Sequence, residues 1–391
     1  MTQVITKSPR IEVVDALRGF AVIAILLVHS IEHFIFPVYP TDSPAWLQTL
    51  DLAVFEVTFS LFAGKAYAIF ALLFGFTFYI QQRNQLHKGN DFGYRYLWRL
   101  LLLVGFATLN AAFFPAGDVL LLFSITGVSL FIVRNWNNKT ILITCIICLM
   151  QPIEVYHLIN YLVNSSYTLP DLQVKEMYAT IAESTKSGDF LSFIWNNITT
   201  GQKASLFWAI NGGRFIQTIG LFLLGYLIAR KELFITNTKT NNFWGKTLII
   251  GAIAFAPLLQ LKTMAMGSDS EIIQKTIGNI FDMWQKLAFT FVLVSSFVLL
   301  YQNERIKKRC NGLRTYGKMS LTNYVTQSIM GAIIYFPFGL YLSPYCGYTL
   351  SLLIGVLLVI MQIQFCAYWL KSHKQGPLES IWHKLTWINN R

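Results

Sequence analysis

Long apolar runs alternate with short polar segments along almost the whole sequence. Ten such runs are present, over residues 13–36, 65–82, 93–114, 118–134, 139–162, 204–229, 246–261, 278–301, 317–340 and 346–370. A helix needs about 20 apolar residues to cross a bilayer. Because lipid offers no partner for backbone N–H and C=O groups, each run is predicted to be helical. The pattern therefore predicts an all-α, polytopic integral membrane bundle of about ten transmembrane helices.

Composition and charge agree with this picture. The 391 residues are 54% hydrophobic and only 13% charged, whereas soluble domains carry about 25% charged residues. The net charge of +12 would suit a nucleic-acid partner, but the basic residues lie in alternate loops between the runs. That placement is typical of topology signals, so no nucleic-acid partner is expected and both termini are predicted to be cytoplasmic. We expect an integral protein of the bacterial cytoplasmic membrane, in contact with membrane lipid.

Residues 1–391 are predicted to form a single bundle with two unusual segments. Residues 44–62 mix polar and apolar positions and are predicted to form a helix lying in the membrane interface. Residues 163–203 are the longest polar stretch, and we expect an extracytoplasmic insertion with one short amphipathic helix. Cys145 and Cys148 form a C-x-x-C without further ligands nearby, so ordinary buried thiols and no metal site are expected.

The first run carries a stripe of polar side chains. Arg18 and His29 are eleven residues apart, about 1100° of helical rotation, so they share one face at a separation of about 16 Å. Asp15, Glu32 and His33 fall within about 60° of Arg18 on the same face. An imidazole this deep in a membrane span is costly unless it is paired or functional. His29 is therefore interpreted as a functional residue facing an internal passage that it shares with Arg18.

Simpler explanations exist for the other members of the stripe. Asp15 and Arg18 lie at the predicted cytoplasmic edge, where arginine side chains extend towards the headgroups. Glu32 and His33 can lie in the outer headgroup zone. If the stripe is functional, His29 can act as a general base. Glu32, one turn away, would then orient the imidazole, and Arg18 would hold an anionic group such as a phosphate.

Several stretches resemble known membrane families. Residues 14–29 read V-D-A-L-R-G-F-A-V-I-A-I-L-L-V-H and resemble the first-span signature of the transmembrane acyltransferase superfamily. The segments at 64–76, 99–127, 316–328 and 375–387 resemble its YeiB-like branch (domain of unknown function 418). Residues 204–391 contain the part that resembles the closing domain of that branch.

The resemblance implies acyl transfer from a cytoplasmic thioester donor to an acceptor at the outer face. Arg18 and His29 would take the positions of the superfamily's first-span arginine and histidine. His29 stands where YeiB-like proteins usually have asparagine, which favours an enzyme. Asn110 stands near a position where they often have histidine, so a scheme with two histidines is not expected.

Besides Arg18, the candidates for substrate or donor binding are Asp15, Asn110 and five further residues. Lys65 opens the second run, where it could extend outward or bind a carboxylate. Arg214 lies inside the sixth run, as a ligand anchor or as the partner of an acid such as Glu154 or Asp282. Asp118 is explained as well by helix capping as by chemistry, and Asn323 and Gln327 by interhelical hydrogen bonds.

We therefore predict a membrane acyltransferase with His29 as general base and Glu32 as its orienting group. A small-molecule acceptor and acyl-CoA or a similar thioester would be co-substrates, and no tightly bound cofactor is expected. The alternative is a transporter or flippase for a small anionic or amphipathic solute, with Arg18, Lys65 and Arg214 lining its path. The sequence does not contain paired broken spans in two matching halves, a pattern typical of transporters. A scaffold without turnover and any oligomeric state remain open.

Overall fold

The computed structural model of the chain describes residues 11–388, which form helices and connecting turns and no strand. The N-terminal half contains α1 (Glu12–Ile31), α2 (Ala45–Phe62), α3 (Lys65–Leu86), α4 (Gly93–Phe113), α5 (Leu120–Thr126), α6 (Val128–Val133), α7 (Asn138–Leu149), α8 (Pro152–Val163), α9 (Val174–Lys186), α10 (Phe190–Asn196) and α11 (Gln202–Asn211). A π-helical turn over Asn197–Gly201 joins α10 to α11. The predicted all-α architecture is thus confirmed.

The remaining helices are α12 (Arg214–Arg230), α13 (Thr238–Met266), α14 (Glu271–Ile273), α15 (Asn279–Leu300), α16 (Glu304–Arg309), α17 (Asn311–Lys318), α18 (Ser320–Tyr335), α19 (Tyr348–Trp369) and α20 (Pro377–Thr386). A π-helical turn over Gln274–Gly278 joins α14 to α15, and a short 3₁₀ turn over Ser343–Tyr345 precedes α19.

Fewer helices could cross a membrane than the ten predicted. Six helical stretches among the described residues are long and apolar enough, or up to eight if each of two bent helix pairs is one span. The stretch 120–133 is apolar, but it extends only about 21 Å, less than the roughly 30 Å of a hydrocarbon core. The predicted ninth run is interrupted at Met319, which leaves the 16-residue α18. Several long apolar helices nevertheless indicate an integral membrane protein.

Two predicted spans are bent. The fifth breaks between α7 and α8 with a 51° bend, where Gln151 has φ 59° and precedes Pro152. The sixth breaks between α11 and α12 with a 78° bend. Gly213 at that point has φ 67°, a left-handed conformation that glycine adopts without steric penalty. Hydrophobicity continues through both breaks, so the runs alone did not reveal them.

Close backbone contact holds α3 against α12. A Cβ added at Gly75 would lie 1.9 Å from the carbonyl oxygen of Phe222, and one at Gly225 would lie 1.8 Å from that of Leu72. Each glycine thus faces the backbone of the other helix, as small residues do at helix crossings in membrane proteins. Tyr67 of α3 and Thr218 of α12 are joined by a short hydrogen bond. The crossing fixes the distance between two helices that carry candidate site residues.

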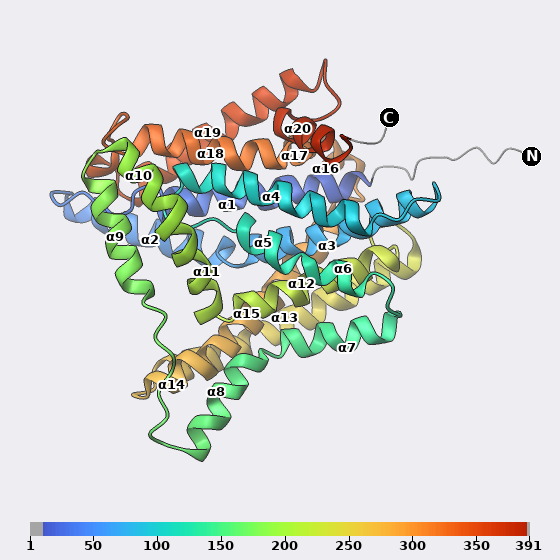
Figure 1. Cartoon of the computed structure of the whole chain (residues 1–391), viewed down its shortest axis with the longest axis horizontal. Coiled ribbons are helices and arrows are strands. Elements are labelled where there is room, and N and C mark those ends of the chain that lie inside the picture. The colour runs from blue at the N-terminus through green and yellow to red at the C-terminus, as the bar shows by residue number, and fades with distance from the viewer. Residues whose placement is uncertain (1–10, 389–391) are drawn as a thin grey trace, which may run out of the picture.

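The bundle helices run along the long axis of the molecule. Figure 1 shows α1, α3, α4, α18 and α19 side by side, while α7 packs against α12 and α8 projects away from the bundle. Helix α1 begins and α20 ends at the same end of the molecule (Figure 1). Which end faces the cytoplasm stays a prediction. The predicted location of the termini also depends on residues 1–10 and 389–391, and these lie outside the described residues.

The two unusual segments of the sequence are also helical. Helix α2 covers the segment predicted to lie in the interface, and Asp51 on it accepts a 2.7 Å hydrogen bond from the backbone N–H of Thr349 at the start of α19. The segment 163–203 contains α9, α10 and the beginning of α11. It packs over the bundle, because Tyr178 of α9 donates a 3.0 Å hydrogen bond to the carbonyl of Ala116. The location of both segments relative to a membrane stays a prediction.

Candidate functional site

The polar face of α1 lines two separate cavities. Arg18 lines an inner cavity of about 270 Å³ at the end where α1 begins. His29, with Glu32 and His33, lines an outer cavity of about 360 Å³ near the other end of α1. Helix α1 ends at Ile31, so Glu32 and His33 lie in the following turn and still reach the outer cavity. The inner and outer cavities have no lining residue in common.

A packed layer separates the cavities, which corrects the expectation of one continuous passage. Tyr324 of α18 lines the inner cavity, and its ring centroid is 6.1 Å from that of His29. Tyr324 packs in one apolar cluster with Ile25, Ala66 and Leu120. The Tyr324 hydroxyl is buried and has no hydrogen-bond partner among the described residues. The barrier next to His29 is thus about one side chain thick.

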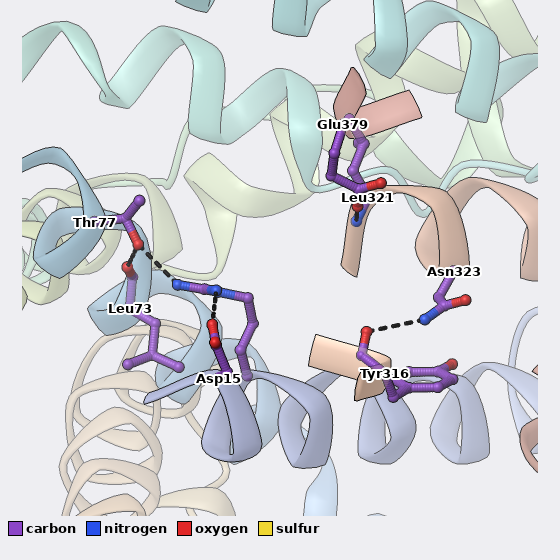
Figure 2. A network of polar contacts seen from close by, with 8 residues as sticks. Asp15, Leu73, Thr77, Tyr316, Leu321, Asn323 and Glu379 are labelled. Atoms are coloured by element: carbon purple, nitrogen blue, oxygen red, sulfur yellow. Dashed lines mark hydrogen bonds and ion pairs between the residues drawn. The ribbon is translucent and has the colours of Figure 1, made fainter. Parts of the chain in front are cut away.

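Hydrogen bonds from two helices fix Arg18 in the inner cavity. Its guanidinium donates to Asp15 Oδ1 at 3.1 Å and to Thr77 Oγ1 of α3 at 2.9 Å. Figure 2 shows Asp15 and Thr77 on neighbouring helices, and Thr77 in turn bonded to the carbonyl of Leu73. Asp15 contributes to the site by positioning this arginine and does not itself line the cavity.

A second arginine lines the inner cavity. The Arg99 guanidinium lies 3.6 Å from the ring centroid of Trp382 on α20, and the Trp382 indole donates a 3.1 Å hydrogen bond to the Arg99 carbonyl. Lys318 and His383 also line this cavity. Arg18, Arg99 and Lys318 thus bring three basic side chains to a lining that holds one carboxylate, that of Glu379, while Asp15 pairs with Arg18. The surplus of basic groups suits an anionic ligand.

Helix α20 also holds the start of α18. Glu379 accepts a hydrogen bond from the backbone N–H of Leu321 at 2.7 Å (Figure 2). It also accepts from the backbone N–H of Thr322 at 3.1 Å and from the Thr322 hydroxyl at 2.6 Å. These N–H groups have no partner within their own helix, so the carboxylate caps α18 from a distant segment. Burial nevertheless raises the pKa of Glu379 above its ordinary value, because desolvation outweighs these hydrogen bonds.

Aromatic and amide groups surround His29, which is 8% exposed. Its Nδ1 lies 3.5 Å from the amide nitrogen of Gln327 on α18, and its ring centroid is 4.5 Å from that of Phe114. The Glu32 carboxylate lies 3.7 Å from His33 Nε2 and does not pair with the His29 ring; only the Glu32 backbone N–H bonds to His29, at its carbonyl. Gln327 thus occupies the orienting position that the sequence assigned to Glu32, while His33 connects Glu32 to the neighbourhood of His29.

Asn110 and Asp118 belong to a buried hydrogen-bond network. Asn110 is 0% exposed, donates to Asp118 Oδ1 at 3.1 Å and accepts from the Ser328 hydroxyl at 2.8 Å. Asp118 also accepts from the N–H groups of Leu120 and Leu121, so it caps α5. Asp118 lines the outer cavity and Asn110 does not. The capping explanation thus accounts for two of these hydrogen bonds to the Asp118 carboxylate, and the third comes from Asn110.

Three other candidates form contacts inside the protein and line neither cavity. Lys65 is 3% exposed and donates to the carbonyl of Ser60 at 2.6 Å, so it does not extend outward. Asn323 donates to the carbonyl of Tyr316 at 3.0 Å (Figure 2) and contacts Cys366 of α19 at 3.3 Å. Gln327 contacts His29 as described. For Asn323 and Gln327, these contacts are the interhelical hydrogen bonds considered above.

Arg214 lines the outer cavity without the acidic partner suggested by the sequence. Its guanidinium lies 4.3 Å from the ring centroid of Trp208 and 5.5 Å from that of Tyr67. Asp282 instead binds Lys262 at 2.6 Å and also binds Lys286. Sequence reasoning had assigned neither aromatic ring to the site, because both lie on apolar faces and show no distinctive spacing.

Sequence reasoning also missed Arg99, Lys318, Trp382 and Tyr324 as cavity residues. Arg99 and Lys318 were interpreted as topology signals, and Trp382 was included only as part of the segment 375–387 that resembles the YeiB-like branch. That resemblance was the one signal that could have directed attention to Trp382. Tyr324 gave no signal, because a tyrosine in an apolar helix is common.

Comparison with known proteins places the chain among bacterial relatives. Residues 228–389 match the family model described as "Protein of unknown function (DUF418)". The chain is 25% identical to "Uncharacterized protein YxaH" of Bacillus subtilis (strain 168), over 97% of this chain and 95% of the relative. It is 24% identical to "Uncharacterized protein YeiB" of Escherichia coli (strain K12), over 95% of each chain. No solved structure matches the chain. The chain is thus similar over almost its whole length to the YxaH and YeiB proteins, as a distant relative, and its residues 228–389 are similar to the DUF418 family.

Proposed function

We propose that the chain is a membrane acyltransferase that moves an acyl group from a thioester in the inner cavity to an acceptor in the outer cavity. One observation carries the proposal: a basic cavity and a histidine-lined cavity face each other across a barrier one side chain thick. Arg18 and Arg99 would hold the anionic part of the thioester. His29 lies on the other side of Tyr324, within reach of an acceptor hydroxyl in the outer cavity.

The chemistry follows from this arrangement. His29 takes the proton of the acceptor hydroxyl while its oxygen attacks the thioester carbonyl carbon. The new C–O bond forms, the C–S bond breaks, and the imidazolium returns the proton to the departing thiolate. Gln327 at Nδ1 orients the ring. The reacting carbonyl must pass the Tyr324 side chain, so a rotation of that ring is part of the proposal.

Thiol release tests the proposal. The purified protein in nanodiscs is mixed with acyl-CoA of several chain lengths, and free thiol is measured with a thiol-reactive dye. His29→Ala is expected to reduce release by about 10²–10⁴-fold, the usual contribution of a general base. His87→Ala is the matched control, because His87 is exposed at the end of α3. Equal rates in His29→Ala and wild type, or no release by wild type, would contradict the proposal.

Transport of an anionic solute is the second candidate, and the break between α11 and α12 favours it. The break exposes the beginning of α12 beside the outer cavity, with Arg214 as its first residue. Transporters often direct the positive ends of broken helices at anionic substrates. Uptake of a labelled anion into proteoliposomes without any thiol release would favour this candidate over the enzyme.

A further inference from the structure

The outer cavity contains an unneutralised arginine. Among residues 11–388, no ion pair and no side-chain hydrogen bond involves the Arg214 guanidinium; its contacts are the rings of Trp208 and Tyr67. The carboxylates that line the same cavity have other donors. Asp118 accepts three hydrogen bonds from Asn110 and α5, and Glu32 lies against His33. The fixed charge of Arg214 is thus available to a molecule in the cavity.

The surroundings of Arg214 add positive charge. Arg214 is the first residue of the 17-residue α12, whose N-terminal N–H groups lack a side-chain cap and carry the positive end of the helix dipole. Behind Gly64, which lines the cavity, the Lys286 side chain packs against the backbone. Lys286 shares the single carboxylate of Asp282 with Lys262. Two lysines with one acid leave a surplus of positive charge in this wall. The buried Glu154 carboxylate lies against the backbone of Gly213, next to Arg214, and among the described residues it forms no ion pair with the guanidinium.

We infer that Arg214 binds an oxyanion, a phosphate or carboxylate, on a small molecule held in the outer cavity. A guanidinium presents paired N–H donors that match the oxygens of such groups. The rings of Trp208 and Tyr67 lie against the Arg214 guanidinium and restrict its movement, while its N–H groups stay free for hydrogen bonds. Oxyanion binding by Arg214 does not depend on the proposed function, but the identification of the bound molecule as the acyl acceptor does. The acceptor is then a hydroxyl compound that also carries an oxyanion.

Equilibrium binding tests this inference without any acyl donor. Glycerol 3-phosphate, glycerate, inorganic phosphate and glycerol are titrated against the purified protein in nanodiscs by calorimetry. The three anions separate phosphate from carboxylate recognition, and glycerol carries the hydroxyl groups alone. Wild type is expected to bind at least one anion more tightly than glycerol. Arg214→Gln is expected to weaken that binding by about tenfold or more, which corresponds to about 1.4 kcal/mol.

Arg230→Gln is the matched control, because Arg230 lies at the opposite end of α12 and donates to the Trp136 carbonyl at 2.8 Å. It is expected to bind like wild type. Arg214→Lys keeps the positive charge but lacks the paired N–H donors of a guanidinium, so its affinity should fall between those of wild type and Arg214→Gln. It also controls for misfolding of the glutamine variant. Equal binding by wild type and Arg214→Gln, or no binding of any oxyanion by wild type, would overturn the inference.

The two proposals can fail separately. If oxyanions bind through Arg214 but no thiol is released from acyl-CoA, the acyltransferase proposal fails and the oxyanion site stands. If thiol release occurs and glycerol serves as acceptor as well as glycerol 3-phosphate does, the acceptor class is wrong while the enzyme stands.

Discussion

The crossing of α3 and α12 permits a quantitative prediction of stability. In Gly225→Ala, the new Cβ would lie 1.8 Å from the Leu72 carbonyl oxygen, whereas an ordinary contact is 3.4–4 Å. The carbonyl belongs to a helix backbone and cannot rotate away, so the two helices must separate locally by about 1.6 Å, in a core packed as tightly as a crystal. Overpacking of this kind costs about 1–3 kcal/mol.

Separation would also break polar contacts across the crossing. The hydrogen bond between Tyr67 and Thr218 joins the same two helices, and its loss adds about 1 kcal/mol. We therefore expect Gly225→Ala to lower the free energy of unfolding by about 3 kcal/mol. For a chain of this size that corresponds to a midpoint roughly 6 °C lower, at about 2 °C per kcal/mol.

Thermal unfolding in one detergent, followed by tryptophan fluorescence, measures this effect. Gly105→Ala is the control, since a Cβ at this position in α4 would meet nothing within 4 Å. It should leave stability unchanged or raise it by up to about 1 kcal/mol through helix propensity. Because Gly75 lies at the same crossing, the double variant with Gly75→Ala should lose less than the sum of the single losses. A Gly225→Ala variant as stable as Gly105→Ala would refute the close crossing.

Three further outcomes are expected. Asp118→Ala removes the partner of Asn110 and the cap of α5, so it should lower the free energy of unfolding by about 2–3 kcal/mol. An unchanged unfolding midpoint would contradict the hydrogen-bond network. With other cysteines replaced, a membrane-impermeant maleimide should label Ser166→Cys on intact cells and Cys310 only after permeabilisation; the reverse pattern would invert the predicted topology. Burial raises the pKa of Glu379 above its usual 4.5, so the folded chain holds that proton more tightly than the unfolded chain. Its contribution to stability therefore falls as the pH rises above the ordinary value of 4.5 towards the raised pKa of the folded chain. Glu379→Gln should remove this fall, and parallel pH profiles of the two proteins would contradict the assignment.

The sequence was informative where local geometry determines the outcome. Helical periodicity predicted a polar face on the first span, since regular α-helices repeat every 3.6 residues. Composition predicted an all-helical membrane protein, because lipid excludes unpaired backbone. The capping explanation for Asp118 also followed from local sequence, because a cap acts on the residues directly after it.

Contacts between distant segments were not accessible in the same way. Tyr324 lies between the cavities because α18 packs against α1, and nothing in the spacing of residues around it indicates that packing. For Arg214 the sequence left both a ligand anchor and an acidic partner open, because buried charges are usually paired, whereas the fold gives it two aromatic rings and an open cavity. The break at Gly212 and Gly213 divides an apolar run, and a hydropathy pattern continues across such a bend.

The central claim is transfer between the two cavities, and the sidedness of thiol release tests it most directly. The protein is reconstituted into sealed vesicles, its orientation is determined by protease access, and acyl-CoA is supplied on one side only. Thiol release should occur when acyl-CoA faces the inner cavity, where Arg18 and Arg99 lie, and should disappear in His29→Ala. Release only when acyl-CoA faces the outer cavity, or release that persists in His29→Ala, would contradict the account.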